Sequence, residues 1–458
     1  MKSSASTIRL AIIALLVLIL SIRRDGFFPF SANIDPLTWA WLLAAQVILL
    51  LLLLFFFFKP QLIEHIVYKL KGKIQLPPHL IVLGLVNLLI LFTLVLHLSS
   101  SRTFPEYFHF GKNDALVFAL LTIPLVSFPI LTKKPALAVF SLFLATIILA
   151  LIPIHYYEIT ANTADLLPII QKQLDAFVNG QNIYQYFLLD NGVVTQAVRQ
   201  PGTTLSFLPA FLQGLDIRFM SLIYTLLTGV VLLKFQYRKL QEAKFDTKFF
   251  ITFSAIALFL LFPYRQVRHD LYEPFYWFLI TLSLYWLHIG KLKWFALTWA
   301  LGIFTQVWFW LFTPFAAVYL WRKYSFQQAV IVMGAAVAIG VGLLSVFILK
   351  NPNAYLEHVF GFYAGEIAKG SYAASTIHLT PLFTEYGLNR FLLPLQLFSL
   401  GVVGLFTLLR VKTWEKFLTA LVLVFTYFVL FNSVSWNYMY IGLVVLMLVY
   451  LITTTKEH

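Results

Sequence analysis

The 458-residue chain contains no cysteine. A disulfide framework, a thiolate nucleophile and a cysteine-ligated metal site are therefore excluded. Its 10 histidines are scattered without the spacing of metal ligands. No HExxH motif, glycine-rich phosphate loop, dinucleotide fingerprint or serine elbow occurs in a suitable context. We therefore predict neither a metal site nor a bound cofactor.

Charged residues are also scarce, at 11% of the chain, whereas hydrophobic residues make up 60% and mean hydropathy is +0.84. These values lie outside the range of soluble globular domains. Apolar runs of roughly 17–25 residues, enough to cross the hydrocarbon layer as helices, recur along the chain, whereas barrel strands would give short alternating segments. The sequence therefore predicts an all-α, polytopic integral membrane protein with about 12–14 transmembrane helices.

The formal net charge of +14 is better explained by the membrane than by nucleic acid. Lys and Arg flank the apolar runs, where they set the orientation of spans. We therefore predict no nucleic-acid partner. Placing the connectors that contain Lys69 and Lys133 in the cytoplasm puts both termini there as well. Two large loops, 156–203 and 350–390, are then external, and 14 of the 19 acidic residues fall on the external side.

The expected spans follow the apolar runs. They are 9–22, 37–58, 79–98, 115–132, 136–155, 217–236, 249–263, 275–290, 327–349, 391–410, 417–431 and 439–453. Residues 204–214 are expected to form a re-entrant or interfacial piece, because Pro209 and Gly214 interrupt the run. Residues 294–321 lie between two basic pairs, so they should enter and return as two short helices that meet near Gln306. Irregular backbone at membrane depth must be covered by protein or line a water-filled cavity. This suggests a cavity near residues 204–214.

An amphipathic surface helix is expected to begin at Asp165 and to stop at Gly180. Its apolar positions, spaced by three and four residues, are Leu166, Ile170, Leu174 and Phe177. Asp165 fits two roles, an N-cap of this helix or a functional carboxylate. Asp175 lies ten residues further on, is rotated away from Asp165 and is expected to be solvated.

External arginines close to the span ends are candidates for binding a phosphate group, because a guanidinium presents a planar, permanently charged fork of donors. They are Arg199, Arg218, Arg265 and Arg268. Solvated loop arginines are the alternative for each. His269, Asp270 and Glu273 share a connector with Arg265 and Arg268. Glu273 followed by proline is also typical of a helix start.

Several short motifs resemble one known family. They are Asp165-Leu-Leu-Pro, Gly180-Gln-Asn-Ile-Tyr184, Pro201-Gly202 and Gly214-Leu-Asp-Ile-Arg218. The pattern is similar to polyprenyl-phosphate-dependent integral membrane glycosyltransferases of the GT-C fold, in particular to their bacterial mannosyltransferase-like branch. Ile183 replaces a proline of the family, and Gln306 replaces a frequent lysine. The resemblance covers about residues 155–453. It divides the chain into additional N-terminal helices, 1–135, and a GT-C-like membrane domain, 136–458.

The resemblance implies that Asp165 is the general base of an inverting sugar transfer, with no covalent enzyme intermediate and no metal. The donor would be a polyprenyl-phosphate-linked sugar, with mannose as a candidate. The acceptor would be a lipid or glycan on the extracytoplasmic face of a bacterial inner membrane. Arginines, first of all Arg265 and Arg268, would hold the lipid phosphate.

A transporter or flippase of a lipid-linked saccharide is the alternative, and a non-catalytic assembly partner is a weaker one. A transporter would place ionisable groups within its spans at mid-membrane depth. Here 14 of the 19 acidic residues fall on the predicted external side, which favours the enzyme.

Overall fold

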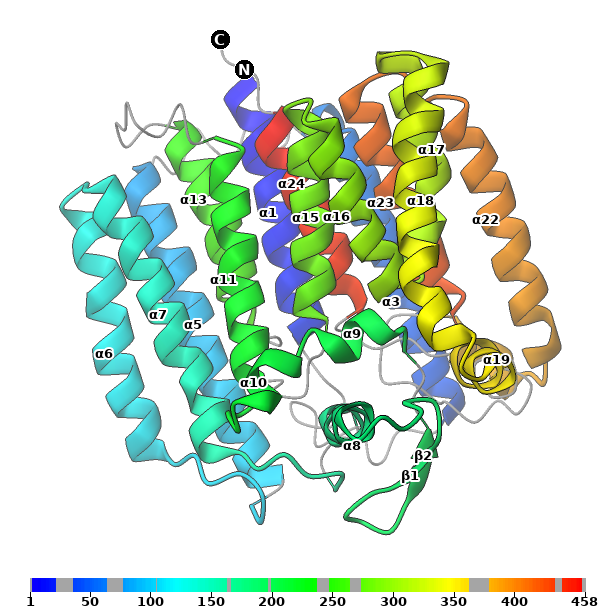
Figure 1. The fold of residues 1–458 in the computed structure, drawn as a ribbon. Coiled ribbons are helices and arrows are strands. Elements are labelled where there is room, and N and C mark those ends of the chain that lie inside the picture. Colours follow the sequence, from blue (N-terminus) through cyan, green and yellow to red (C-terminus); the bar gives the residue numbers. More distant parts are fainter. Residues whose placement is uncertain are drawn as a thin grey trace.

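The computed structural model describes residues 2–21, 36–63, 77–103, 105–162, 166–196, 199–236, 247–263, 273–361, 379–432 and 439–454. Almost all regular structure in these ranges is helical, with one added hairpin of two antiparallel strands. The all-α prediction is therefore confirmed for the part of the chain that is described. Figure 1 shows the helices side by side in one bundle.

The bundle helices match the expected spans within about one helical turn, except that α1 begins earlier and α5 ends later. Their bounds are α1 Lys2–Ser21, α3 Pro36–Phe58, α5 Pro78–Thr103, α6 Lys112–Leu131, α7 Pro135–Tyr156, α11 Arg218–Lys234, α13 Thr247–Leu260, α15 Pro274–His288, α16 Leu292–Thr305, α17 Trp308–Lys323, α18 Phe326–Ile348, α22 Leu392–Leu408, α23 Trp414–Leu430 and α24 Met439–Thr454. Shorter elements are α8 Leu166–Val178, β1 Tyr186–Leu188, β2 Val194–Gln196, α9 Pro201–Leu205, α10 Leu208–Leu212, α19 Pro352–Leu356, the π-helical η2 Glu357–Gly361, α21 Thr380–Glu385 and η3 Asn389–Phe391.

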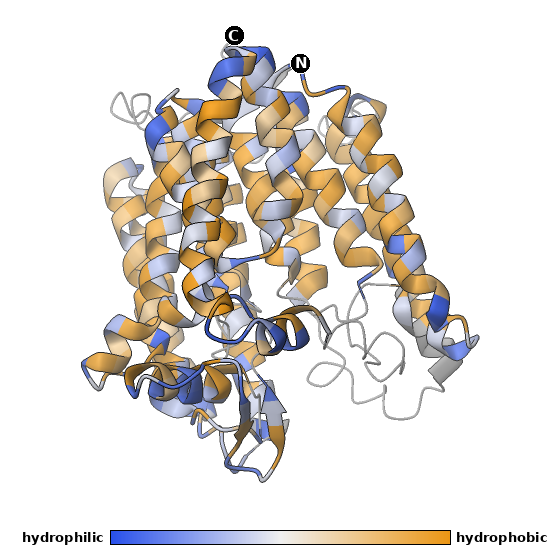
Figure 2. Ribbon diagram, turned by 45° about the vertical axis from the view of Figure 1, so that its right-hand side comes forward, coloured by the Kyte–Doolittle hydropathy of each residue, from blue (hydrophilic) through white to orange (hydrophobic). Residues whose placement is uncertain are grey.

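Five of these helices are long and apolar enough to cross a membrane, so the protein is a multi-pass membrane protein. They are Pro78–Arg102, Lys112–Leu131, Pro135–Tyr156, Phe326–Ile348 and Asn389–Leu408. Five shorter apolar helices accompany them among the described residues. Side chains on the outside of the bundle fit contact with lipid, since Phe398 on α22 is 70% exposed and Val346 on α18 is 65% exposed. Figure 2 shows the helices mostly apolar along their length, with polar residues gathered towards their ends.

The bundle has two distinct ends. Helix α1 begins and α24 ends at the same end, which we call the terminal end (Figure 1). The opposite end carries α8, α9, α10 and the β1–β2 hairpin, and we call it the hairpin end. This arrangement agrees with the expectation that both termini share one side of the membrane. Which side is cytoplasmic stays a prediction from the charge pattern.

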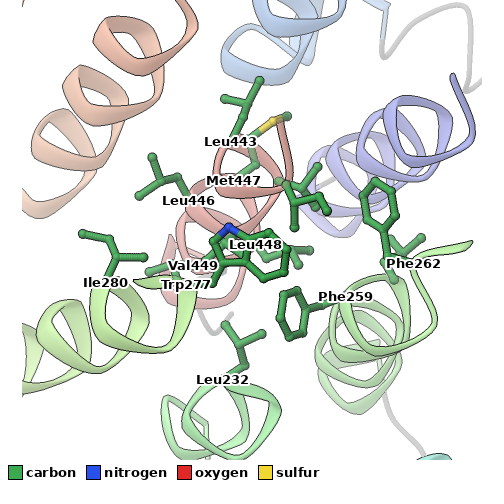
Figure 3. Close-up of a cluster of buried hydrophobic side chains, with 14 of the residues drawn as sticks. Leu232, Phe259, Phe262, Trp277, Ile280, Leu443, Leu446, Met447, Leu448 and Val449 are labelled. Carbon is green, nitrogen blue, oxygen red and sulfur yellow. The ribbon is translucent and has the colours of Figure 1, made fainter. Parts of the chain in front are cut away.

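Helix α24 forms the centre of the bundle. Every residue from Met439 to Ile452 is buried, as expected for a helix that is apolar all round. Figure 3 shows Trp277, Phe259 and Leu232 from three neighbouring helices packed around its side chains. The same hydrophobic cluster includes α1 and α3 residues, so the N-terminal helices share this core. The division at residue 135 stays a prediction.

Both predicted breaks in the helical pattern are confirmed. The short helices α9 and α10 precede α11, in place of one long span. Helices α16 and α17 meet at Gln306, which ends α16. Helix α16 has 14 residues and its neighbour α18 has 23, so α16 is shorter by roughly 13 Å at 1.5 Å per residue. Helix α9 packs against the end of α16 (Figure 1).

Two glycines on α18 allow a matched test of helix packing. A Cβ on Gly340 would lie 2.7 Å from Ile303 Cγ2 and 3.0 Å from the Ala300 carbonyl oxygen, whereas a Cβ on Gly342 would meet nothing within 4 Å. We expect Gly340→Ala to destabilise the α16–α18 contact by about 1–3 kcal/mol. Gly342→Ala should leave stability unchanged or raise it slightly. Thermal unfolding in detergent measures both, and equal melting temperatures for the two variants would contradict this packing.

Candidate functional site

Helix α8 forms as the sequence predicts and lies across the hairpin end (Figure 1). It spans Leu166–Val178, and Gly180 follows with a φ of +71°, the left-handed conformation that ends many helices. Leu167, Ile170 and Leu174 are buried. The Phe177 ring stacks on Phe347 of α18 at a centroid distance of 6.2 Å. Asp165, the predicted catalytic residue, directly precedes α8 in sequence but lies outside the described residues.

Helix α9 joins α8 to the end of α16 through hydroxyl groups. Thr203 Oγ1 donates to the Thr305 carbonyl oxygen at 2.7 Å. Thr204 Oγ1 donates to Gln173 Oε1 of α8 at 2.9 Å. A Cβ on Gly202 would lie 2.6 Å from Thr305 Oγ1 and 2.9 Å from the Phe304 carbonyl oxygen, so only glycine permits this approach. We call this contact of α8, α9 and the end of α16 the α9 junction.

Two of the predicted site residues flank the α9 junction, because Arg199 lies two residues before α9 and Gln306 directly follows α16. Arg199 is half-buried just before α9, and its carbonyl oxygen accepts a hydrogen bond of 3.0 Å from Tyr184 Oη. Gln200 follows it, is 2% exposed and forms the N-cap of α9. Gln306 directly follows Thr305, is buried, and accepts from the Val307 amide at 3.0 Å through its side-chain oxygen. The segments of the junction therefore carry one half-buried arginine and three buried carboxamides, those of Gln173, Gln200 and Gln306.

Glu273 lies at the start of α15, with Pro274 at the first helical position as predicted. Its side chain is 1% exposed. One turn further on, the Tyr276 ring packs edge-on against Trp308, the first residue of α17, with a centroid distance of 5.0 Å. The first turns of α15 and α17 are thus in contact, which brings Glu273 to the same end of these helices as Gln306.

Arg218 lies elsewhere, at the start of α11, and its contacts favour a structural role. Its Nε donates to Asp216 Oδ1 at 2.9 Å. Its terminal nitrogens donate to the carbonyl oxygens of Pro153, Ile154 and Tyr157 at 2.7, 3.2 and 2.8 Å. These carbonyl groups belong to the last turn and the C-cap of α7, and that of Pro153 also accepts from the Tyr157 amide at 3.2 Å. Arg218 is therefore engaged in fastening α7 to α11.

The remaining predicted substrate-binding residues, Arg265, Arg268, His269 and Asp270, lie outside the described residues. Residues that the sequence interpretation missed include Gln173, Gln200 and Thr203. A signal for Gln173 was present, because it lies three residues after Ile170 on the apolar face of α8, where a polar side chain requires a partner. Nothing in the sequence indicated that Thr203 would reach the Thr305 carbonyl group.

The β1–β2 hairpin fixes the chain that leads towards α8. Asp190 accepts hydrogen bonds from Thr160 Oγ1 at 2.8 Å and from the Ala161 amide at 3.1 Å. The hydrogen bond from Thr160, with help from the backbone amides, lowers the pKa of the exposed Asp190 carboxyl. On the other side, Tyr186 Oη donates to Glu357 of η2 at 2.8 Å. Segments from both predicted external loops are therefore in contact at the hairpin end.

Comparisons of the chain with protein-family models, with curated proteins and with solved structures give no match. Among the described residues, no group of three or more His, Asp or Glu side chains is arranged to hold a metal ion. Chemically, an arginine side chain suits an anionic group, and the carboxamides and hydroxyls of the α9 junction suit hydrogen bonds to hydroxyl groups.

The role of Arg218 can be tested by stability. Arg218→Gln would leave the three carbonyl groups and the Asp216 carboxylate without their guanidinium, and we expect a loss of about 3 kcal/mol, the lower end of the range for a broken buried ion pair because Asp216 is partly exposed. Arg102→Gln, at an exposed position near the end of α5, is the control and should have little effect. Thermal unfolding of the two purified proteins gives the comparison. Similar melting temperatures would show that Arg218 is available for another role.

Proposed function

We propose that the protein is an inverting membrane glycosyltransferase that transfers a sugar from a polyprenyl-phosphate donor to a lipid or glycan acceptor. The observation that carries the proposal is the α9 junction, where Gln200 and Gln306 are buried and Arg199 lies half-buried two residues before α9. Polar groups of this kind are costly inside a bilayer and are retained mainly for function. The GT-C resemblance adds the reaction type, and mannose is the candidate sugar.

The proposed reaction assigns a role to each group. Asp165 accepts the proton of the acceptor hydroxyl, whose oxygen attacks the anomeric carbon. The bond between this carbon and the phosphate oxygen breaks, and polyprenyl phosphate leaves with the bonding electrons. Arg199 stabilises the negative charge of the leaving phosphate, and Arg265 and Arg268 join it by resemblance. The carboxamide of Gln306 contacts the phosphate or the sugar as a neutral donor.

The position of the α9 junction at the hairpin end of the bundle suits an amphipathic donor, which has an apolar polyprenyl chain and a polar sugar phosphate. Helix α16 ends there at Thr305, and the Phe304 ring lies 5.9 Å from the Phe347 ring near the end of α18. A phosphate bound at this level would lie near the membrane surface, with its polyprenyl chain among the apolar helix faces. Arg218 is left out of the site because its donors are engaged by α7 and Asp216.

The test is sugar transfer by the purified full chain in lipid, supplied with a panel of polyprenyl-phosphate sugars and lipid or glycan acceptors. Loss of the general base should make Asp165→Asn at least about 100-fold slower. Asp175→Asn is the matched control, because Asp175 lies exposed on α8 and should retain full activity. Both variants should unfold at the wild-type temperature.

Two outcomes would count against this function. Undiminished transfer by folded Asp165→Asn would remove Asp165 as the base. Movement of the lipid-linked sugar across the bilayer, with no new glycosidic bond for any acceptor, would support the flippase instead.

A further inference from the structure

A second feature, independent of the proposed function, lies at the opposite, terminal end of the bundle. The turn between α15 and α16 contacts the turn between α17 and α18. Tyr324 Oη lies 3.4 Å from the position that a Cβ on Gly290 would occupy. Gly290 itself has a φ of +75°, which lets the chain reverse tightly here. Two connectors that are far apart in sequence thus form one surface.

Four cationic side chains lie on these two touching turns or on the helix ends beside them. They are Lys291, Lys293, Arg322 and Lys323, all exposed. The sequence contains no Asp or Glu between Glu273 and Glu357, so neither turn supplies a carboxylate. Lys323 Nζ instead lies 5.3 Å from the ring centres of both Tyr319 and Tyr324. This ammonium group is therefore held in place by aromatic rings, with its charge unneutralised by its own helices.

Exposed aromatic side chains indicate the level of this surface in the bilayer. Trp294, at the start of α16, is 54% exposed, and Trp321, near the end of α17, is 52% exposed. Phe326 packs edge-on against Trp321 at 5.8 Å. Exposed tryptophans near helix ends prefer the headgroup layer. The four cations therefore lie at the height of lipid phosphates.

We propose that the touching α15–α16 and α17–α18 turns form a binding site for the headgroup of an anionic phospholipid. Positive charge without internal carboxylates matches a phosphodiester headgroup. The neighbouring aromatic side chains pack on the glycerol and upper acyl region. If these basic residues served only to orient the helices in the membrane, they would be expected at this end of the bundle. The contact between the two turns would not be required.

The experiment measures lipid binding to the full chain by native mass spectrometry, using phosphatidylglycerol and phosphatidylcholine with matched acyl chains. Wild type should bind phosphatidylglycerol more tightly. The double variants Arg322→Gln with Lys323→Gln, and Lys291→Gln with Lys293→Gln, should each weaken phosphatidylglycerol binding about tenfold or more. Phosphatidylcholine binding should stay unchanged, and raised salt should reduce the difference between the lipids.

The control is Lys133→Gln with Lys134→Gln, two exposed lysines on the single α6–α7 turn at the same end of the bundle. This variant should change phosphatidylglycerol binding less than twofold. Equal binding of the two lipids to wild type, or an equal loss in the control, would overturn the proposal. Displacement of phosphatidylglycerol by an equal concentration of inorganic phosphate would also overturn it, because the ligand would then be free phosphate.

Discussion

The hydrogen bond of 2.7 Å from Thr203 Oγ1 to the Thr305 carbonyl oxygen connects the two places where the helical pattern breaks. Each break leaves backbone groups without helical partners, which a bilayer does not tolerate in contact with lipid. Packing one break on the other solves this for both, and Gly202 makes the approach possible. The α9 junction, with its buried carboxamides, follows from this constraint.

The same constraint separates two kinds of polar residue in this protein. Arg218 serves the fold, because it donates hydrogen bonds to the carbonyl groups at the end of α7. At the terminal end, Lys323 and its neighbours face outward, towards the headgroup layer. Arg199 and Gln306 differ from both, since Arg199 is half-buried and Gln306 is buried at the α9 junction, where we propose that a lipid-linked sugar phosphate binds.

The helices, the α8 amphipathic segment and the break at Gln306 could be predicted because they depend on local patterns: apolar length, the period of α8 and flanking charge. The α9 junction could not, because the partner of Thr203 lies more than a hundred residues away in sequence. The role of Arg218 could not be predicted either. In the sequence, an arginine that binds a phosphate and an arginine that binds a helix terminus are the same residue near the end of a span.

Binding of a polyprenyl phosphate at the α9 junction, as we propose, can be measured by photo-crosslinking. A polyprenyl phosphate with a diazirine on its first isoprene unit should label peptides that contain residues 200–205 or 305–308. Excess unlabelled polyprenyl phosphate should suppress this labelling. Labelling confined to the lipid-facing surfaces of α18 and α22, with no suppression by the competitor, would contradict the account.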